Sequence, residues 1–306
     1  MAETTVLEMA KAIRQEDAAL YANVFATSYP VQGLLPIMSM TGFAKPITIA
    51  DTLPTVTPRD FGADFIAAFG KHSTYMVEWK NYGGRLEIDK ALIKGNPQGA
   101  ADQEVMQVQA IAKQWAADVL EGQGGTSVVG IQKYLANFFS GQILNSTSST
   151  ANGDALTMDL MDKLLDQVAG ADALFMSKYN RRLLTTLART NAAGQQNISW
   201  VEDRFGVQVE AYNKVPIYTM EDAETGADIL SNIQRDGADA NNSTTSVYAV
   251  HFGEDGVFGF APGGQALDVE VVNPGTHAMV TRLESNVGIG MSRRRGAGQI
   301  KFLKSA

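Results

Sequence analysis

The chain contains no cysteine, and its 306 residues include only three histidines, His72, His251 and His277. Without cysteine it forms neither disulfides nor thiolate metal sites, and it has no cysteine nucleophile. No two of the histidines stand three or four residues apart, the spacing that places two metal ligands on one helix face. The sequence therefore predicts no metal site and no cofactor, and the lack of cysteine favours an intracellular folding history.

Sequence motifs of catalysis are also missing. There is no Gly-x-Ser-x-Gly elbow, no P-loop and no Gly-x-Gly-x-x-Gly turn that opens a helix. Adjacent acidic pairs such as Glu202 with Asp203 would point to opposite faces of a strand, so solvated charges explain them. We therefore expect no catalytic residues and no enzyme, although a soluble α/β enzyme whose residues assemble from distant positions remains an alternative.

The N-terminus has neither a basic start nor an apolar run, so we expect no secretory signal. No apolar stretch approaches the ~20 residues needed to cross a bilayer. The formal net charge of −8 argues against a surface devoted to nucleic-acid phosphates. We expect no membrane partner and a globular chain with room for two domains, since 45% of its residues are hydrophobic.

The stretch from Lys45 to Gly122 organises the rest of the chain. Two extended segments are predicted to form a long hairpin, and a long amphipathic helix over residues 102–121 follows. Asp102 is placed in the first turn of this helix and Gly122 just after its end. Steps of three and four residues put one apolar stripe on the helix: Val105, Val108, Ala112, Trp115 and Val119.

The tip of the predicted hairpin is unusually apolar. It contains Phe61, Phe65, Ile66 and Phe69, whereas a solvated loop is normally polar. A two-stranded ribbon needs another surface, and an exposed apolar patch marks a protein contact. One helical turn would place Phe65 and Phe69 on the same side. We interpret the four residues as candidate inter-subunit contacts, with an arm folded back on its own domain as the alternative.

Before the hairpin, residues 4–25 are predicted to form a helix, and the Pro- and Gly-containing segment 28–42 an irregular extended arm. The Gly-rich segment 121–132 matches neither phosphate-binding glycine pattern and is predicted to be a flexible loop.

The middle of the chain reads as a mixed α/β region. Asp154 is a candidate cap for a helix that ends before Gly170, and Ser177 caps a second helix after a short buried strand, Ala-Asp-Ala-Leu-Phe-Met. The Asp255-Gly256 pair predicts a tight hairpin between the strands on either side of it.

The last fifth of the chain contains two segments of period-two alternation, ALDVEVV and NVGIGMS, which are predicted to pair with each other. HAMVTRLES is expected to extend the second strand, and QIKFL forms a final strand. The run Arg293, Arg294 and Arg295 before it is a candidate for phosphate contact, because guanidinium groups suit phosphates. We favour a solvated turn or an inter-subunit salt bridge as the explanation of this run.

The order of these elements resembles the major capsid proteins of tailed bacteriophages, the Hong Kong 97-type capsid fold that encapsulins also share. The resemblance covers nearly the whole chain. Its most specific parts are Leu53-Pro54-Thr55-Val56 and the Gly83-to-Asp89 stretch that enters the helix, which look like the two strands of that family's extended loop.

The resemblance implies an α+β fold with four parts. They are an N-terminal arm (1–44), an extended β-hairpin loop (45–84), a peripheral domain (85–127 and 265–292) with the spine helix at 102–121, and an α/β axial domain (128–264 and 293–306). Some relatives carry a scaffolding segment before the arm. Because this chain begins almost at the arm, we expect a separate scaffolding protein or a segment that has been removed.

The resemblance further implies a major capsid protein that self-assembles from hexamers and pentamers into an icosahedral virion head in the host cytoplasm. The head would enclose double-stranded DNA without sequence-specific binding, with a portal and a possible decoration protein as partners. The alternative from the same fold is an encapsulin-like compartment shell.

Overall fold

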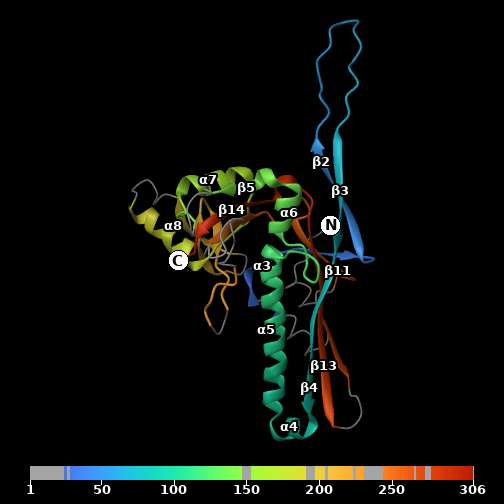
Figure 1. The fold of residues 1–306 in the computed structure, drawn as a ribbon, viewed down its shortest axis with the longest axis vertical. Coiled ribbons are helices and arrows are strands. Elements are labelled where there is room, and N and C mark those ends of the chain that lie inside the picture. The colour runs from blue at the N-terminus through green and yellow to red at the C-terminus, as the bar shows by residue number, and fades with distance from the viewer. Residues whose placement is uncertain are drawn as a thin grey trace.

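The computed structural model describes residues 24–25, 28–146, 153–190, 197–203, 206–222, 225–230, 244–264, 267–272 and 277–305. The long axis of the molecule carries a protruding hairpin at one end and a long helix beside a long strand pair toward the other (Figure 1). A second body projects sideways from the middle of this axis, with α7 and α8 on it (Figure 1).

The long helix is α5, Pro97–Glu121. It starts earlier than the predicted residue 102, because Pro97 occupies the first helical position and the Asn96 side chain accepts a hydrogen bond from the Gly99 N–H at 3.1 Å. Asp102 therefore lies beyond the first turn, contrary to our expectation. The end of the helix is as predicted, with the Gly122 N–H bonded to the Asp118 carbonyl at 2.9 Å.

The apolar stripe predicted for this helix is confirmed. Val108, Ala112, Trp115 and Val119 are fully buried, and Val105 is half-buried against the same core. Phe25 packs on Trp115 with ring centroids 5.9 Å apart. The long helix is thus the centre of the main core.

A five-stranded sheet packs beside α5, with β13 at its centre. The sheet contains β1 (Ile37–Met40), β4 (Lys80–Asp89), β11 (Val257–Pro262), β12 (Asp268–Val272) and β13 (Ala278–Met291). Strand β4 pairs antiparallel with β13 over its whole length. It also lies directly on α5, because a Cβ added at Gly84 would fall 1.7 Å from Nε2 of Gln107.

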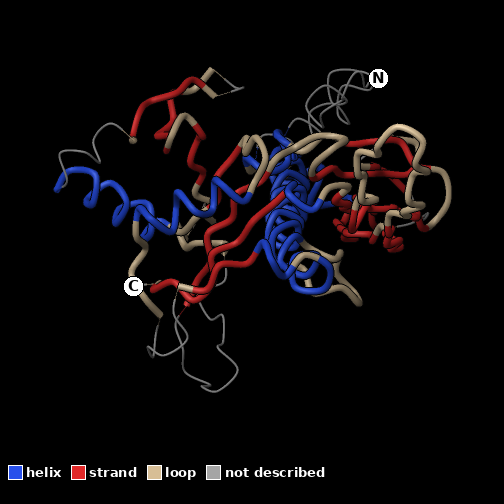
Figure 2. The backbone as a smooth tube through the Cα atoms, turned by 90° about the horizontal axis from the view of Figure 1, so that it is seen from above, coloured by secondary structure: helices blue, strands red, loops and turns tan. Residues whose placement is uncertain are grey.

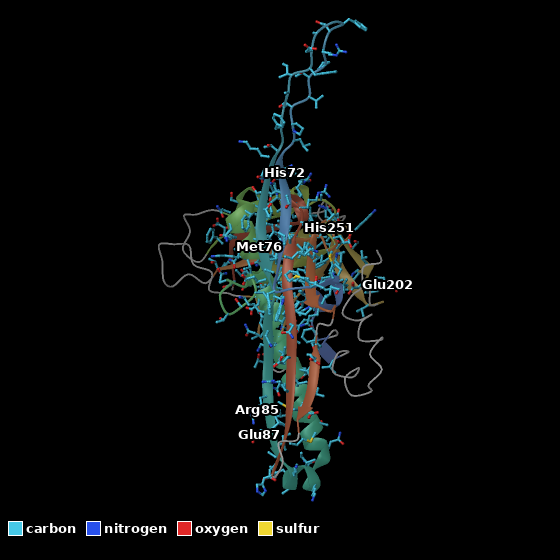
Figure 3. The ribbon with its side chains drawn as sticks, turned by 90° about the vertical axis from the view of Figure 1, so that its right-hand side faces the viewer. His72, Met76, Arg85, Glu87, Glu202 and His251 are labelled. Carbon is cyan, nitrogen blue, oxygen red and sulfur yellow. The ribbon has the colours of Figure 1, made fainter. Side chains whose placement is uncertain are left out.

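The hairpin consists of β2 (Ala44–Thr52) and β3 (Lys71–Glu78), which pair with each other. Ladder pairing ends at Thr52 and Lys71, and the loop 53–70 continues outward without regular structure. Figure 3 shows His72 where the hairpin leaves the body, and Arg85 and Glu87 of β4 far toward the opposite end. The returning strand therefore enters the five-stranded sheet from Lys80 onward.

The projecting body is built on a seven-stranded sheet. In spatial order its strands are β5 (Ile143–Asn145), β14 (Ala297–Lys304), β10 (Thr244–Val250), β6 (Ala173–Phe175), β9 (Val215–Tyr218), β8 (Gln208–Tyr212) and β7 (Ile198–Glu202). Helices α7 (Met158–Gln167) and α8 (Lys178–Thr190) bury Leu164 and Leu184 against one face. The other face, with Phe175 and Tyr248, joins the core around α5. Seen from above, the sheet runs outward from α5 toward α8 (Figure 2).

The hairpin predicted at Asp255-Gly256 is wrong. A turn forms there, with the Gly256 N–H bonded to the Gly253 carbonyl at 3.0 Å. However, β10 already has β14 and β6 on its two edges, so β11 cannot pair with it and joins the other sheet instead. The chain crosses between the two sheets at this turn.

The pairing predicted between ALDVEVV and NVGIGMS is also wrong. β12 pairs with the first half of β13, from Asp268 opposite Glu284 to Val272 opposite Val280. The NVGIGMS half of β13 pairs with β11. The prediction that HAMVTRLES extends the second strand is confirmed, because β13 runs unbroken over both segments.

The arm expected to be irregular contains two regular elements. α3 (Pro30–Leu34) begins with a proline, whose missing N–H costs nothing at the first helical position. β1 follows and pairs parallel with β11. The helix predicted over residues 4–25 lies outside the described residues except for Val24 and Phe25, which are both helical.

Several local predictions for the middle of the chain have clear outcomes. The buried strand β6 is confirmed, and Ser177 Oγ accepts from the Asn180 N–H at 3.3 Å at the start of α8. α7 is capped by Thr157, which accepts from the Leu160 N–H, while Asp154 instead bridges to Leu303. The final strand is confirmed as β14.

The Gly-rich segment after α5 is compact, contrary to the expected flexible loop. The Gly130 N–H donates to the Gly122 carbonyl at 2.8 Å, and Gln123 bridges to Val129. Two further helices lie on either side of α5 in the sequence. α4 (Lys90–Gly95) precedes it at the far end of the molecule and buries no residue (Figure 1), and α6 (Ile131–Phe138) follows this turn and buries Ile131, Tyr134 and Leu135 in the main core.

Candidate functional site

The predicted contact residues at the hairpin tip are all strongly exposed. Phe61, Phe65, Ile66 and Phe69 have exposed fractions of 70% or more. The tip stands clear of the body in two perpendicular views (Figures 1 and 3). The arm therefore does not fold back on its own domain, which was the alternative interpretation.

The tip is held by short local contacts instead of by a helix. The Ala63 N–H donates to the Asp60 carbonyl at 3.2 Å, Arg59 Nη1 donates to the Ala63 carbonyl at 2.6 Å, and the Arg59 guanidinium lies 4.8 Å from the centre of the Phe65 ring. The expectation that one helical turn aligns Phe65 and Phe69 is wrong, because residues 63–70 form neither a helix nor a strand.

The base of the hairpin is anchored on its own domain. Ile47, Ile49, Tyr75 and Val77 face inward and are buried, as the period-two alternation of β2 and β3 requires. A Cβ added at Gly290 would fall 2.7 Å from Ile47 Cδ1, so the hairpin lies directly on β13. The hairpin is thus packed on its own domain at its base and exposed at its tip.

Tyr75 is the polar part of this anchor. Its hydroxyl donates to the Met291 carbonyl and accepts the Met291 N–H at 3.1 Å. Its ring stacks on Phe138 and tilts against Tyr134, with centroids 4.9 and 5.3 Å away. Burial raises the pKa of Tyr75 to about 12, although the backbone hydrogen bond from Met291 lowers it, so the phenol stays protonated near neutral pH.

Each arginine of the run 293–295 makes a contact within the chain. Arg293 forms an ion pair with Asp255 at 3.4 Å, and Arg294 forms one with Asp51 of β2 at 3.3 Å. Arg295 donates to the last carbonyls of α7, those of Asp166 at 2.5 Å and Gln167 at 2.9 Å. The run therefore joins the hairpin, the turn after β10 and the end of α7, and the Arg293 and Arg294 side chains remain half-exposed.

A polar clamp lies where the chain crosses between the two sheets. His251 contacts Asp172 through Nδ1 at 2.8 Å and Asp255 through Nε2 at 3.2 Å. Burial lowers the pKa of His251, but the hydrogen bond with Asp255 and the charges of both carboxylates outweigh it, so the pKa is raised above the ordinary value. Figure 3 shows His251 on the same side of the molecule as Glu202 of β7.

Sequence reasoning missed one basic surface. Arg181, Arg182 and Arg189 line a groove of about 310 Å³ on α8, together with Thr185, Thr186 and Glu210. The available signal was the spacing of the arginines at seven and eight residues, which places them on one face of a helix. This spacing alone does not reveal the groove, because Glu210 at its edge belongs to the distant strand β8.

In the part of the chain that the structure describes, no group of three or more His, Asp or Glu residues is arranged to hold a metal ion. Among the same residues, no helix is both long enough and apolar enough to span a membrane.

No family model matches the chain, and no curated protein matches it either. Solved structures do. An encapsulin complex from Synechococcus elongatus superposes with a TM-score of 0.62 at 14% identity, covering 91% of this chain and 89% of that one. This chain has the Hong Kong 97-type capsid fold.

Two further structures support that fold assignment. The capsid protein of an empty GTA particle gives a TM-score of 0.59 at 12% identity and covers 90% of both chains. A structure from Mycobacterium phage Bobi gives 0.59 at 13% identity and covers 98% of both chains. The capsid fold therefore extends over almost the entire sequence, and the predicted α+β class is confirmed.

Proposed function

We propose that this chain is the major capsid protein of a tailed-phage head and assembles in many copies into a closed icosahedral shell around double-stranded DNA. The observation that carries the proposal is the combination of a capsid fold over nine-tenths of the chain with a hairpin that is anchored at its base and presents four apolar side chains at its tip. A tip of this kind suits a chain whose apolar surface is covered by a neighbouring copy.

In this proposal the parts of the chain have the roles that the resemblance implies. Residues 45–84 are the extended loop, residues 85–127 and 265–292 the peripheral domain, and residues 128–264 and 293–306 the axial domain around the capsomer centre. Hexamers and pentamers form the shell in the host cytoplasm. A separate scaffolding protein and a portal assist assembly, a decoration protein is an optional partner, and the chain has no catalytic role.

A second candidate is the shell of an encapsulin-like compartment, which the superposition on the Synechococcus elongatus encapsulin complex favours. The two functions differ in what the shell encloses. Phage heads contain double-stranded DNA, and compartments of the second kind contain cargo protein.

Size-exclusion chromatography and negative-stain microscopy of the purified chain test the proposal. Megadalton particles or capsomer rings are expected, whereas a monomer or dimer that is stabilised by a small molecule would point to the α/β enzyme. Nuclease-protected DNA in particles from infected or lysogenic cells supports the head, and enclosed protein without DNA supports the compartment.

A further inference from the structure

The groove on α8 is a cationic surface without an internal partner. Arg182 and Arg189 are exposed and Arg181 is half-buried. Among the described residues, no carboxylate forms an ion pair with any of the three, and Glu210 at the groove's edge is no exception. The hydroxyls of Thr185 and Thr186 donate to helix carbonyls at 3.0 and 2.9 Å, so the arginines supply the free donors.

The position of Arg181 runs against the electrostatics of its own helix, whereas Arg189 in the last turn agrees with it. The first turn of α8 contains no acidic residue, although the helix dipole favours anions there, and it ends in Arg181. Lys178 in the same turn is neutralised by Glu221 at 2.6 Å, whereas Arg181 and Arg182 are not neutralised in this way. A residue that does not stabilise its own helix indicates a function outside the folded subunit, such as binding.

An exposed aromatic residue lies beside the groove. Trp200 of the edge strand β7 is directly opposite Glu210 of β8, and paired residues in antiparallel strands share a face of the sheet. Trp200 is 65% exposed. Arginine and tryptophan together are the residue types that dominate binding energy at protein interfaces.

The charge balance of the groove and of the chain identifies the partner. The Glu210 carboxylate among the arginines would repel a phosphate backbone. A protein surface carries charges of both signs and is compatible with it. The chain carries 33 acidic and 25 basic residues, so a second copy offers an excess of carboxylates to a cationic groove. Two arginine grooves facing each other would repel, so the contact is head-to-tail, the arrangement that closes into rings.

We propose that this α8 groove, with Trp200 at its side, receives carboxylates of a second copy of this chain in a head-to-tail contact. The inference rests on the proposed function, since it needs a chain that assembles. It adds a second contact surface, on the projecting body and away from the hairpin tip.

Charge reversal tests the contact. The double variant Arg182→Glu/Arg189→Glu is expected to fold normally, since both side chains are exposed, but to reduce rings and particles at least about tenfold at a fixed concentration. Lys163→Glu on α7 is the control, because Lys163 is an exposed helical cation of the same body that pairs with Asp159 of its own helix at 2.6 Å. It should assemble like the wild type. Normal assembly of the double variant overturns the proposal.

Zero-length coupling identifies the partner. In the Arg182→Lys variant, a carbodiimide joins the new amine to any carboxylate in contact with it, and mixed isotope-labelled and unlabelled copies distinguish links between copies from links within one. We expect a link to an Asp or Glu of another copy. A link only to Glu210 of the same copy overturns the proposal.

Two other outcomes are separable. The double variant could assemble normally while its unassembled subunits no longer bind DNA in a gel-shift assay that the wild type passes. In that case the groove binds phosphate and the proposal is wrong. If neither the wild type nor Lys163→Glu forms rings or particles, the proposed function itself fails, and with it the assembly on which the groove contact depends.

Discussion

Tyr75 and Met291 bind each other through both polar groups of the Met291 backbone. The phenol donates to the Met291 carbonyl and accepts its N–H at 3.1 Å, across 216 positions of sequence. Tyr75 is 6% exposed and Met291 is 1% exposed, so neither backbone group has water as a substitute. This pair fixes the hairpin on the end of β13.

Removal of the Tyr75 hydroxyl should therefore destabilise the subunit. We expect Tyr75→Phe to lower the free energy of unfolding by about 1–3 kcal/mol, because it leaves two buried backbone groups unpaired. Urea unfolding followed by circular dichroism measures the change. Thr74→Val is the matched control on the opposite, exposed face of the same strand, where only a bond to Thr48 at 3.0 Å is lost. An equal decrease in the free energy of unfolding in both variants would show that the Tyr75 hydroxyl does not anchor the hairpin.

The close contact of Gly122 and Gly130 gives a second prediction. A Cβ on Gly130 would lie 2.5 Å from the Asp118 carbonyl oxygen and from the Gly122 nitrogen, which are backbone atoms that cannot rotate away. Gly130→Ala should cost about 1–3 kcal/mol of stability. Gly141→Ala is the control, because a Cβ on Gly141 would have no other side chain or distant backbone within 4 Å. Thermal unfolding that shows equal midpoints for the two variants would refute the packing argument.

The clamp around His251 predicts a pH-dependent stability. Its pKa in the folded chain is raised, so the charged form is favoured by folding. The stabilisation is full below the unfolded pKa of about 6.5 and is lost as the pH rises through the folded pKa. The difference in melting temperature between the wild type and His251→Gln should shrink as the pH rises above about 6.5. A melting-temperature difference that does not change with pH would show that Asp172 and Asp255 do not stabilise the protonated His251.

The sequence was sufficient for elements whose stability is local. The stripe on α5, the Ser177 cap and the buried strand β6 follow from residue spacing and capping chemistry within a few positions. The exposed apolar tip was also visible, since four large apolar residues in one loop have no local explanation.

The pairing of distant strands was not accessible. The Asp255-Gly256 turn is locally a good hairpin turn, but β10 is saturated by β14 and β6, which lie far from it in sequence. The same competition decides that the second half of β13 pairs with β11 and the first half with β12. The α8 groove was missed because its meaning depends on Glu210 and Trp200, which only the sheet brings beside the helix.

The acidic balance of the chain predicts weak DNA binding by unassembled subunits. Each phosphate contact would retard DNA that must slide as a shell fills, and the three arginines at 293–295 already have partners within the chain. Filter binding at physiological salt should therefore show little retention. Sub-micromolar binding would contradict this prediction.

The hairpin tip gives the most direct test of assembly. Phe65 and Phe69 are 70% and 90% exposed, and burial of each on a neighbouring copy would contribute about 1.5–3 kcal/mol. Phe65→Ser/Phe69→Ser should therefore weaken each contact by several kcal/mol while the subunit's own core, which neither ring enters, is unchanged. Because a shell repeats the loss at every copy, we expect folded subunits or capsomers with an unaltered circular dichroism spectrum and no closed particles by electron microscopy. Phe43→Ser is the control, since Phe43 is 80% exposed but lies at the base, stacked on Trp79 at 5.6 Å. Normal shells from the double variant would show that the tip does not dock, and an unfolded precipitate would show that the tip supports its own subunit.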